Sequence, residues 1–155
     1  MQAREGVLDF LNRHLTVELT AINQYFLQAE MARNWGFERI YEKFRELSME
    51  EMKDAEVLVG HILFLEGLPN MQRLNQVQVG ETVEECFQID LATEMTAVSG
   101  LTEAITHCTN VQDYKTRAML EEMISEEQGH VDWFETQLEA IKRIGIENYL
   151  TEQLH

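Results

Sequence analysis

The chain has 155 residues, 45% of them hydrophobic and 26% charged, and its formal net charge is −16. This length suits one domain covering residues 1–155. Because like charges repel, the negative charge argues against binding nucleic acid or an anionic membrane surface. Two cysteines make no disulfide framework, and we find neither a secretory signal nor a run long enough to cross a bilayer. We therefore expect a cytoplasmic protein.

The first predicted helix runs from about residue 5 to about residue 34. Its apolar residues recur at alternating steps of four and three, a spacing that places them on one helix face. Glu18 interrupts this apolar stripe near its middle. Gly36 follows the helix and can take the left-handed conformation that ends many helices.

The second predicted helix extends to about Glu66, and Pro69 prevents it from continuing. Its apolar stripe contains two acids, Glu51 and Asp54, at positions where packing favours leucine. Residues 67–81 then form a long connection with little periodicity. Such a connection can run the length of a bundle and make the helices before and after it parallel.

The third predicted helix opens at a capping box, residues 82–85, and carries Glu94 on its stripe. The fourth opens at an N-cap, Asp113, and is punctuated by Gly145. Residues 146–154 could form a short terminal helix. The pattern predicts an all-α fold: a four-helix bundle with a long crossover between its second and third helices and a short fifth helix.

The polar residues on the apolar stripes repeat along the chain. Two glutamates are 33 positions apart, a further residue follows three positions later, and the pattern recurs at an offset of 76. The six residues are Glu18, Glu51, Asp54, Glu94, Glu127 and His130. Four carboxylates that converge in a core repel one another strongly, whereas two divalent cations would make them a coordination sphere.

This spacing predicts a dinuclear metal site. Residues three apart share a helix face, so Glu127 with His130, and Glu51 with Asp54, can each contact one ion. Glu51 and Glu127 are placed to bridge two ions, with Glu18 and Glu94 as terminal ligands. A mixed set of carboxylate and imidazole ligands suits iron or manganese, and zinc could also bind.

Asp54 is the mismatch, because the second copy has His130 at the equivalent position. An ionised Asp54 makes the site one unit more negative, which favours ferric over ferrous iron. Asp54 could bind the metal ion directly, bind it through a water molecule, or be a polar helix residue outside the site.

The sequence resembles the bacterioferritin family over its whole length. The resemblance is most specific in the segments AINQYFL (21–27), EMK (51–53), LEGLPN (65–70), EQGH (127–130) and ENYL (147–150). It implies a ferritin-like bundle and a hollow cytoplasmic shell of 24 subunits that stores ferric mineral. It further implies a ferroxidase, which oxidises Fe(II) at a di-iron centre, and a ferredoxin-like electron donor for iron release.

The resemblance also assigns residues. It implies iron-binding and catalytic roles for five residues that match the family's ligand positions: Glu18, Glu51, Glu94, Glu127 and His130. Asp54 departs from the family, which normally has histidine there. The departure predicts reduced ferroxidase activity, as in family members whose haem-bearing subunit co-assembles with a second, active bacterioferritin subunit type.

Met52 is the predicted haem ligand. It follows Glu51, so it points about 100° away from the metal-facing stripe, towards a neighbouring subunit. The resemblance implies a haem b at a dimer two-fold axis, held by this methionine from each of two subunits. From periodicity alone, Met52 is one of eight methionines that fill gaps in packing.

A third hypothesis is a di-iron peroxidase or oxygenase on the same bundle. The short tail and the lack of rubredoxin-like cysteine pairs count against a peroxidase of the rubrerythrin type. Further residues are candidates for supporting roles: Tyr25 as an electron donor beside the irons, and Glu46 with Glu50 as a path that passes cations towards the centre.

Overall fold

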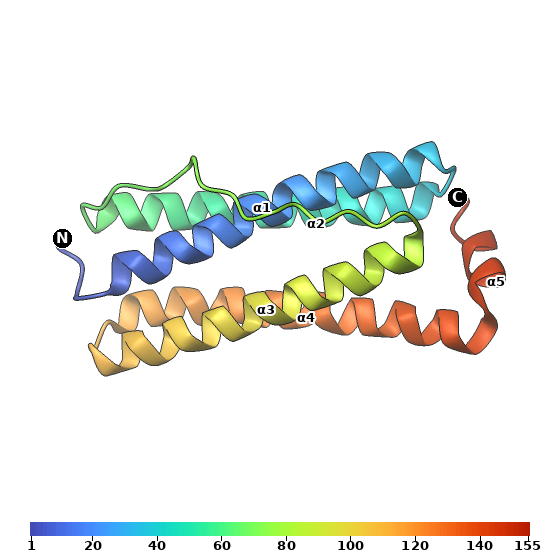
Figure 1. Ribbon diagram of the computed structural model, residues 1–155. Helices are drawn as coiled ribbons and strands as arrows, with labels where there is room; N and C mark the ends of the chain where they lie inside the picture. Colours follow the sequence, from blue (N-terminus) through green and yellow to red (C-terminus); the bar gives the residue numbers. More distant parts are fainter.

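The computed structural model describes residues 1–155. Its four long helices are α1 (Val7–Asn34), α2 (Glu38–Phe64), α3 (Val83–Asn110) and α4 (Tyr114–Ile144). They form an elongated bundle, and the short helix α5 (Ile146–Thr151) lies across one end of it (Figure 1). α1 packs antiparallel to α2, and α3 packs antiparallel to α4. The predicted all-α four-helix bundle with a short fifth helix is confirmed.

The crossover between α2 and α3 runs the length of the bundle, so these two helices are parallel as predicted (Figure 1). Side chains of α1 hold it in place. Asn12 donates from Nδ2 to the carbonyl of Leu68, at 3.2 Å. Further along, Thr20 Oγ1 accepts from the backbone N–H of Asn75 at 2.9 Å. The polar face of α1 thus gives an irregular segment the hydrogen bonds that it cannot make internally.

The predicted helix caps agree with the structure. Thr82 Oγ1 accepts a hydrogen bond from the N–H of Glu85 at 3.1 Å, and Asp113 caps α4 at the N–H of Thr116, at 3.0 Å. Gly36 has the left-handed φ of 91°. α5 ends at Thr151, before the predicted residue 154, because the chain turns there. The carbonyl of Gln153 then accepts a hydrogen bond from the N–H of Arg39, in the first turn of α2.

The apolar core consists of two separate clusters. The cluster near α5 is rich in aromatic side chains, among them Tyr25, Phe44, Phe87, Phe134 and Tyr149. The cluster at the other end is mostly aliphatic, with buried members that include Leu11, Leu15, Leu58, Leu101 and Leu120. On α1, Leu15 belongs to the second cluster and Ala21 to the first, so Glu18 lies between them. A polar layer therefore crosses the middle of the bundle.

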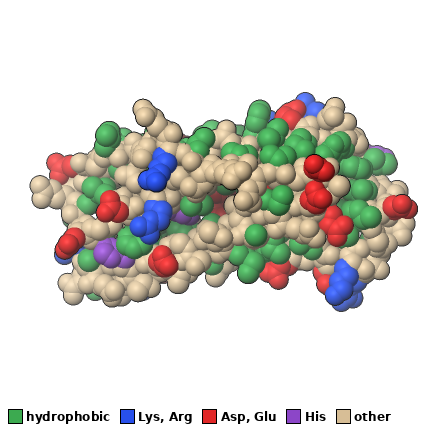
Figure 2. Space-filling model, in the orientation of Figure 1, with side chains coloured by type: hydrophobic (Ala, Val, Ile, Leu, Met, Phe, Trp, Pro, Cys, Tyr) green, Lys and Arg blue, Asp and Glu red, His purple; other side chains and the backbone are tan.

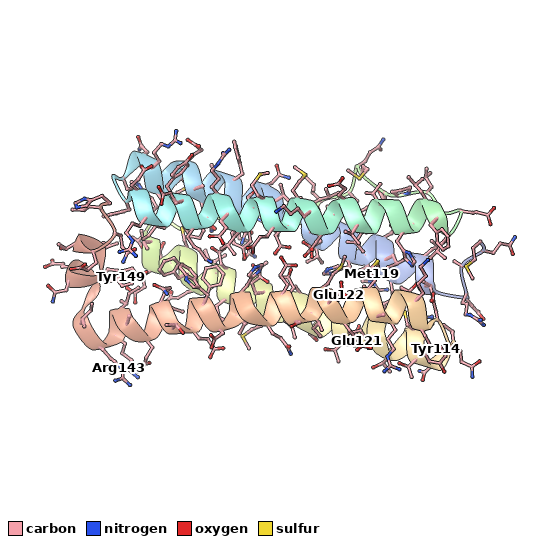
Figure 3. All side chains as sticks on the ribbon, turned by 180° about the vertical axis from the view of Figure 1, so that it is seen from behind. Tyr114, Met119, Glu121, Glu122, Arg143 and Tyr149 are labelled. Carbon is pink, nitrogen blue, oxygen red and sulfur yellow. The ribbon has the colours of Figure 1, made fainter.

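α5 closes the aromatic end of the core. Tyr149 lies at this end of the bundle (Figure 3). Its ring packs edge-on against Phe87, with centroids 6.1 Å apart, and its hydroxyl donates to Gln137 Oε1 at 2.6 Å. On the outer surface, hydrophobic and charged side chains are interspersed over the face that carries the crossover (Figure 2). No helix combines the length and the apolar character needed to span a membrane.

Candidate metal centre

The structure buries all six residues of the repeated pattern in the polar layer. They come from all four long helices, and none is more than 9% exposed: Glu18, Glu51, Asp54, Glu94, Glu127 and His130. A buried carboxylate is costly unless it is protonated, paired or bound to a cation. Five carboxyl groups in one buried layer are therefore stable only if cations neutralise them or protons bind to them.

The six residues form two overlapping groups. In each group, one ligand atom from every member lies within 4.8 Å of the others. The first group is Glu51, Glu94, Glu127 and His130, and the second is Glu18, Glu51, Asp54 and Glu127. Glu51 and Glu127 belong to both. This is the arrangement expected when two carboxylates lie between two neighbouring ions.

His130 lies at the centre of the first group. Its Nδ1 is 3.2 Å from Glu51 Oε1 and 3.6 Å from an oxygen of Glu94 and of Glu127. Burial favours the neutral ring, but the three nearby carboxylates outweigh it and raise the pKa of His130. Without metal, the protonated ring supplies the positive charge that the layer needs. With metal, Nδ1 is free to be a ligand.

The other ring nitrogen of His130 faces away from the centre. Nε2 lies 2.7 Å from Glu50 Oε2. Histidines that bind metals commonly donate their second N–H to a carboxylate, which fixes the tautomer and the ring orientation. Glu50 is placed for this role. From the sequence, Glu50 was predicted only to belong to a path for cations.

Burial makes the carboxyl groups hard to ionise. It raises the pKa of Glu51 to about 7 and, with help from neighbouring Glu127, the pKa of Glu94 to about 8. The pKa of Asp54 is raised to about 8 by burial and by the adjacent carboxyl of Glu126. Burial also raises the pKa of Glu127. Each group would release its proton more readily if a cation replaced it.

Unpaired ligand atoms test whether the centre fits metal ions. Every one of the six residues has a buried side-chain atom without a hydrogen-bond partner: both carboxylate oxygens of Glu18, Glu51 Oε1, Asp54 Oδ2, Glu94 Oε2, Glu127 Oε1 and His130 Nδ1. Native proteins seldom leave so many buried polar atoms unpaired. Oxygen-rich ligation with added imidazole suits iron or manganese, so the residues present fit a di-iron site.

Two further buried residues adjoin the centre, Tyr25 on α1 and Asp90 on α3. The hydroxyl of Tyr25 donates to Glu94 Oε1, so the tyrosine contacts the centre directly. Gln24 Nε2 donates to Asp90 Oδ1 at 2.8 Å, and Asp90 is fully buried. Burial raises the pKa of Asp90 to about 8. Sequence periodicity missed Asp90, although it stands one helical turn before Glu94.

A histidine on α1 was also missed. His14 is only 5% exposed, and its Nε2 lies 2.7 Å from Glu18 Oε1. Burial lowers the pKa of His14 to about 4, so the ring is neutral at physiological pH. The available signal was its place four residues before Glu18, since positions four apart share a helix face.

Met52 lies outside the centre. Its side chain is 48% exposed on α2, in agreement with its predicted direction away from the metal-facing stripe. Other exposed apolar side chains on α1 and α2 include Phe26, at 58%, and Met49, at 49%. The thioether of methionine is a known ligand of haem iron. Haem ligation by Met52 stays a prediction.

Comparisons with known proteins agree with this architecture. Residues 8–144 match the family model described as a ferritin-like domain. The chain is 45% identical to a bacterioferritin of Mycolicibacterium paratuberculosis, over 96% of this chain and 94% of that protein. It is 43% identical to bacterioferritin BfrA of Mycobacterium tuberculosis over the same shares. Identity to a bacterioferritin of Streptomyces coelicolor is 42%, over 97% of this chain and 90% of that one. The chain therefore belongs to the bacterioferritin family.

Proposed function

We propose that this chain oxidises Fe(II) between its four long helices and passes Fe(III) to a mineral stored inside a multimeric shell. The observation that carries the proposal is the pair of four-residue groups that share Glu51 and Glu127. Membership of the bacterioferritin family supports iron storage and self-assembly. We further propose a shell of 24 subunits in the cytoplasm.

The residues of the centre suit this task in three ways. Carboxylates from opposite helices hold two ferrous ions close enough for both to give an electron to one molecule of O2 or peroxide. Oxygen ligands tolerate the change from Fe(II) to Fe(III). Protonated carboxyls, with Glu51 near a pKa of about 7, exchange protons for incoming cations and limit the charge of the buried layer.

A second candidate function is a haem-bearing shell subunit with an impaired centre, which co-assembles with an active subunit type. Asp54 favours it, because aspartate replaces the family's histidine and lies beside another carboxyl, Glu126. The exposed Met52 favours it as well, since a haem b between two subunits needs a ligand on an outer face. A ferredoxin-like donor would then reduce the stored iron through the haem.

The test is stopped-flow oxidation of Fe(II) by the purified shell, at two irons per subunit. The parent protein is compared with Asp54→His and with Glu127→Gln, which removes a carboxylate common to both groups. A fast phase in the parent that Glu127→Gln abolishes supports the ferroxidase. A slow parent that becomes fast in Asp54→His supports the impaired, haem-bearing subunit. If none of the three proteins shows a fast phase of Fe(II) oxidation, oxidation at this centre is overturned.

A further inference from the structure

Outside the metal centre and its neighbour His14, three buried side-chain atoms have no hydrogen-bond partner. They are Nε2 and Oε1 of Gln28 on α1, and Oδ2 of Asp90 on α3. Both side chains are 0% exposed. The Gln28 amide lies near enough to Asp90 to oppose the rise that burial causes in the pKa of this carboxyl, yet no hydrogen bond of ordinary geometry joins them. Buried polar atoms in native proteins are almost always paired, with protein groups or with ordered water.

Neighbouring polar groups are already engaged with other partners. Gln24, one turn before Gln28, donates from Nε2 to Asp90 Oδ1 at 2.8 Å, and its Oε1 accepts from the N–H of Gln78 at 3.1 Å. Tyr25 is close enough to Asp90 for the carboxylate charge to raise its pKa beyond the effect of burial, but its hydroxyl donates to the centre. The amide of Gln28 and the second oxygen of Asp90 are therefore left to a bound ligand.

The donors and acceptors of the two side chains select this ligand. Gln28 offers one N–H donor group and one acceptor. Burial raises the pKa of Asp90 to about 8, so at pH 7 the carboxyl is mostly protonated and can donate or accept at Oδ2. A cation would face the N–H groups of the amide, and an anion would face a carboxyl in a chain of net charge −16. Water both donates and accepts, and a buried water needs two to four polar partners.

We propose that Gln28 and Asp90 bind one ordered water molecule between α1 and α3, beside the metal centre. Three atoms are available to it, the number of hydrogen bonds that a buried water typically makes. Glu94 follows Asp90 by one helical turn, and its charge adds to the effect of burial on the pKa of Asp90, so the site adjoins the centre. The inference goes beyond the proposed function, because neither Gln28 nor Asp90 belongs to the two ligand groups.

The proposed water lies at the inner end of a polar route from the surface. A pocket of about 300 Å³ between α1, the crossover and α3 is lined by amides and hydroxyls, among them those of Thr20, Gln24, Gln78 and Thr93. Gln24 connects this pocket to Asp90 through its hydrogen bond. Because no charged side chain lines the pocket, the route suits neutral water better than ions.

The test is a crystal structure of the metal-free protein at a resolution that shows ordered water. We expect one water oxygen about 3 Å from the amide of Gln28 and from Asp90 Oδ2. Gln28→Met keeps a side chain of similar length but has neither polar atom, so the water should be lost. Gln137→Met is the matched control. Gln137 is partly buried on α4 and bonds to Tyr149 at 2.6 Å, and its replacement should leave the water in place.

A direct hydrogen bond between Gln28 and Asp90, with no water bound to either, would overturn the inference. This outcome needs only the unchanged protein, so it does not depend on how the variants fold. A bound atom with oxygen contacts of about 2.3–2.6 Å would identify a cation in place of water and overturn it as well. Water that stays at the same position in Gln28→Met would show that Gln28 does not hold it.

Discussion

Nε2 of His130 lies 2.7 Å from Glu50 Oε2, on the side of the ring that faces away from the buried carboxylates. Glu50 is partly exposed and is outside the repeated pattern, so its importance comes from this contact alone. It connects the buried layer to the surface of α2. The imidazole is thereby held in place from both sides.

We predict that Glu50→Gln weakens metal binding on the His130 side by ten- to a hundredfold, the usual effect of losing a carboxylate behind a metal-binding histidine. The measurement is the affinity of the metal-free shell for Co(II). Glu46→Gln is the control, because Glu46 lies one turn earlier on α2, is exposed and pairs with Lys43. Equal affinities in the two variants would show that the contact with His130 has no influence on binding.

Replacing Glu94 by glutamine should stabilise the metal-free protein while it weakens metal binding. Glu94 is 1% exposed and lies against other carboxyls, so Glu94→Gln removes a buried acid from a crowded layer. We expect the free energy of unfolding to rise by about 1 kcal/mol, a typical gain from one stabilising substitution at a functional site. Denaturation of the metal-free and metal-loaded shells checks both effects. A less stable metal-free variant would contradict this account of repulsion.

The stability of the metal-free protein should fall between pH 6.5 and pH 8. Folded Glu51, Glu94 and Asp54 have raised pKa values of about 7, 8 and 8, whereas unfolded carboxyls titrate near 4. The folded state therefore holds more protons in this interval, and its stability declines as pH rises. His130, with its raised pKa, acts in the same direction. The lowered pKa of His14 acts in the opposite direction near pH 6.5, where the unfolded ring is still partly protonated, and this effect fades towards pH 8.

Thermal unfolding at the two pH values, with and without metal, measures this effect. The midpoint of the metal-free shell should be lower at pH 8, and bound divalent ions should reduce the difference because they replace the protons. Glu94→Gln should also reduce the difference between the two unfolding midpoints. A metal-free midpoint that rises with pH would mean that the layer is already balanced by other charges.

Thr20 should contribute to stability through the crossover. Its hydroxyl donates to the carbonyl of Thr16 at 2.7 Å and accepts from the N–H of Asn75 at 2.9 Å. Thr20→Val removes both bonds and should cost about 1–2 kcal/mol, because the N–H of Asn75 loses its partner. Thr102→Val is the control: Thr102 is exposed and bonds only to the carbonyl of Val98. Equal losses in the two variants would mean that the crossover is anchored elsewhere.

Met52→Leu should abolish haem binding by the shell. Leucine keeps most of the apolar volume but lacks the thioether sulfur that would bind iron. The parent and Met49→Leu, a change of another exposed methionine one turn earlier on α2, should take up haem with the spectrum of two thioether ligands. Haem bound with that spectrum in Met52→Leu would contradict the assignment.

The repeat at an offset of 76 predicted more of the molecule than composition did, because each acid stands where periodicity requires an apolar residue. The repeat led to the burial of Glu18 and Glu94, apolar periodicity led to the four long helices, and the length of residues 67–81 led to the parallel crossover. His14 and Asp90 escaped, since they lie one turn before those acids, beside the sampled stripe. The contact between Glu50 and His130 was not predicted either, because the two residues are 80 positions apart and only the packing of α4 on α2 brings them together.

The two apolar clusters on either side of the polar layer have a mechanical consequence. α1 with α2, and α3 with α4, are two antiparallel hairpins, joined in sequence only by the crossover. Each hairpin contributes part of both ligand groups. Bound ions would thus join the hairpins at mid-length through shared ligands, where the metal-free centre joins them through contacts such as those of His130 with Glu50 and Glu51. Uptake and release of the ions would then exchange one kind of connection between the hairpins for another, metal–ligand bonds for direct contacts between side chains.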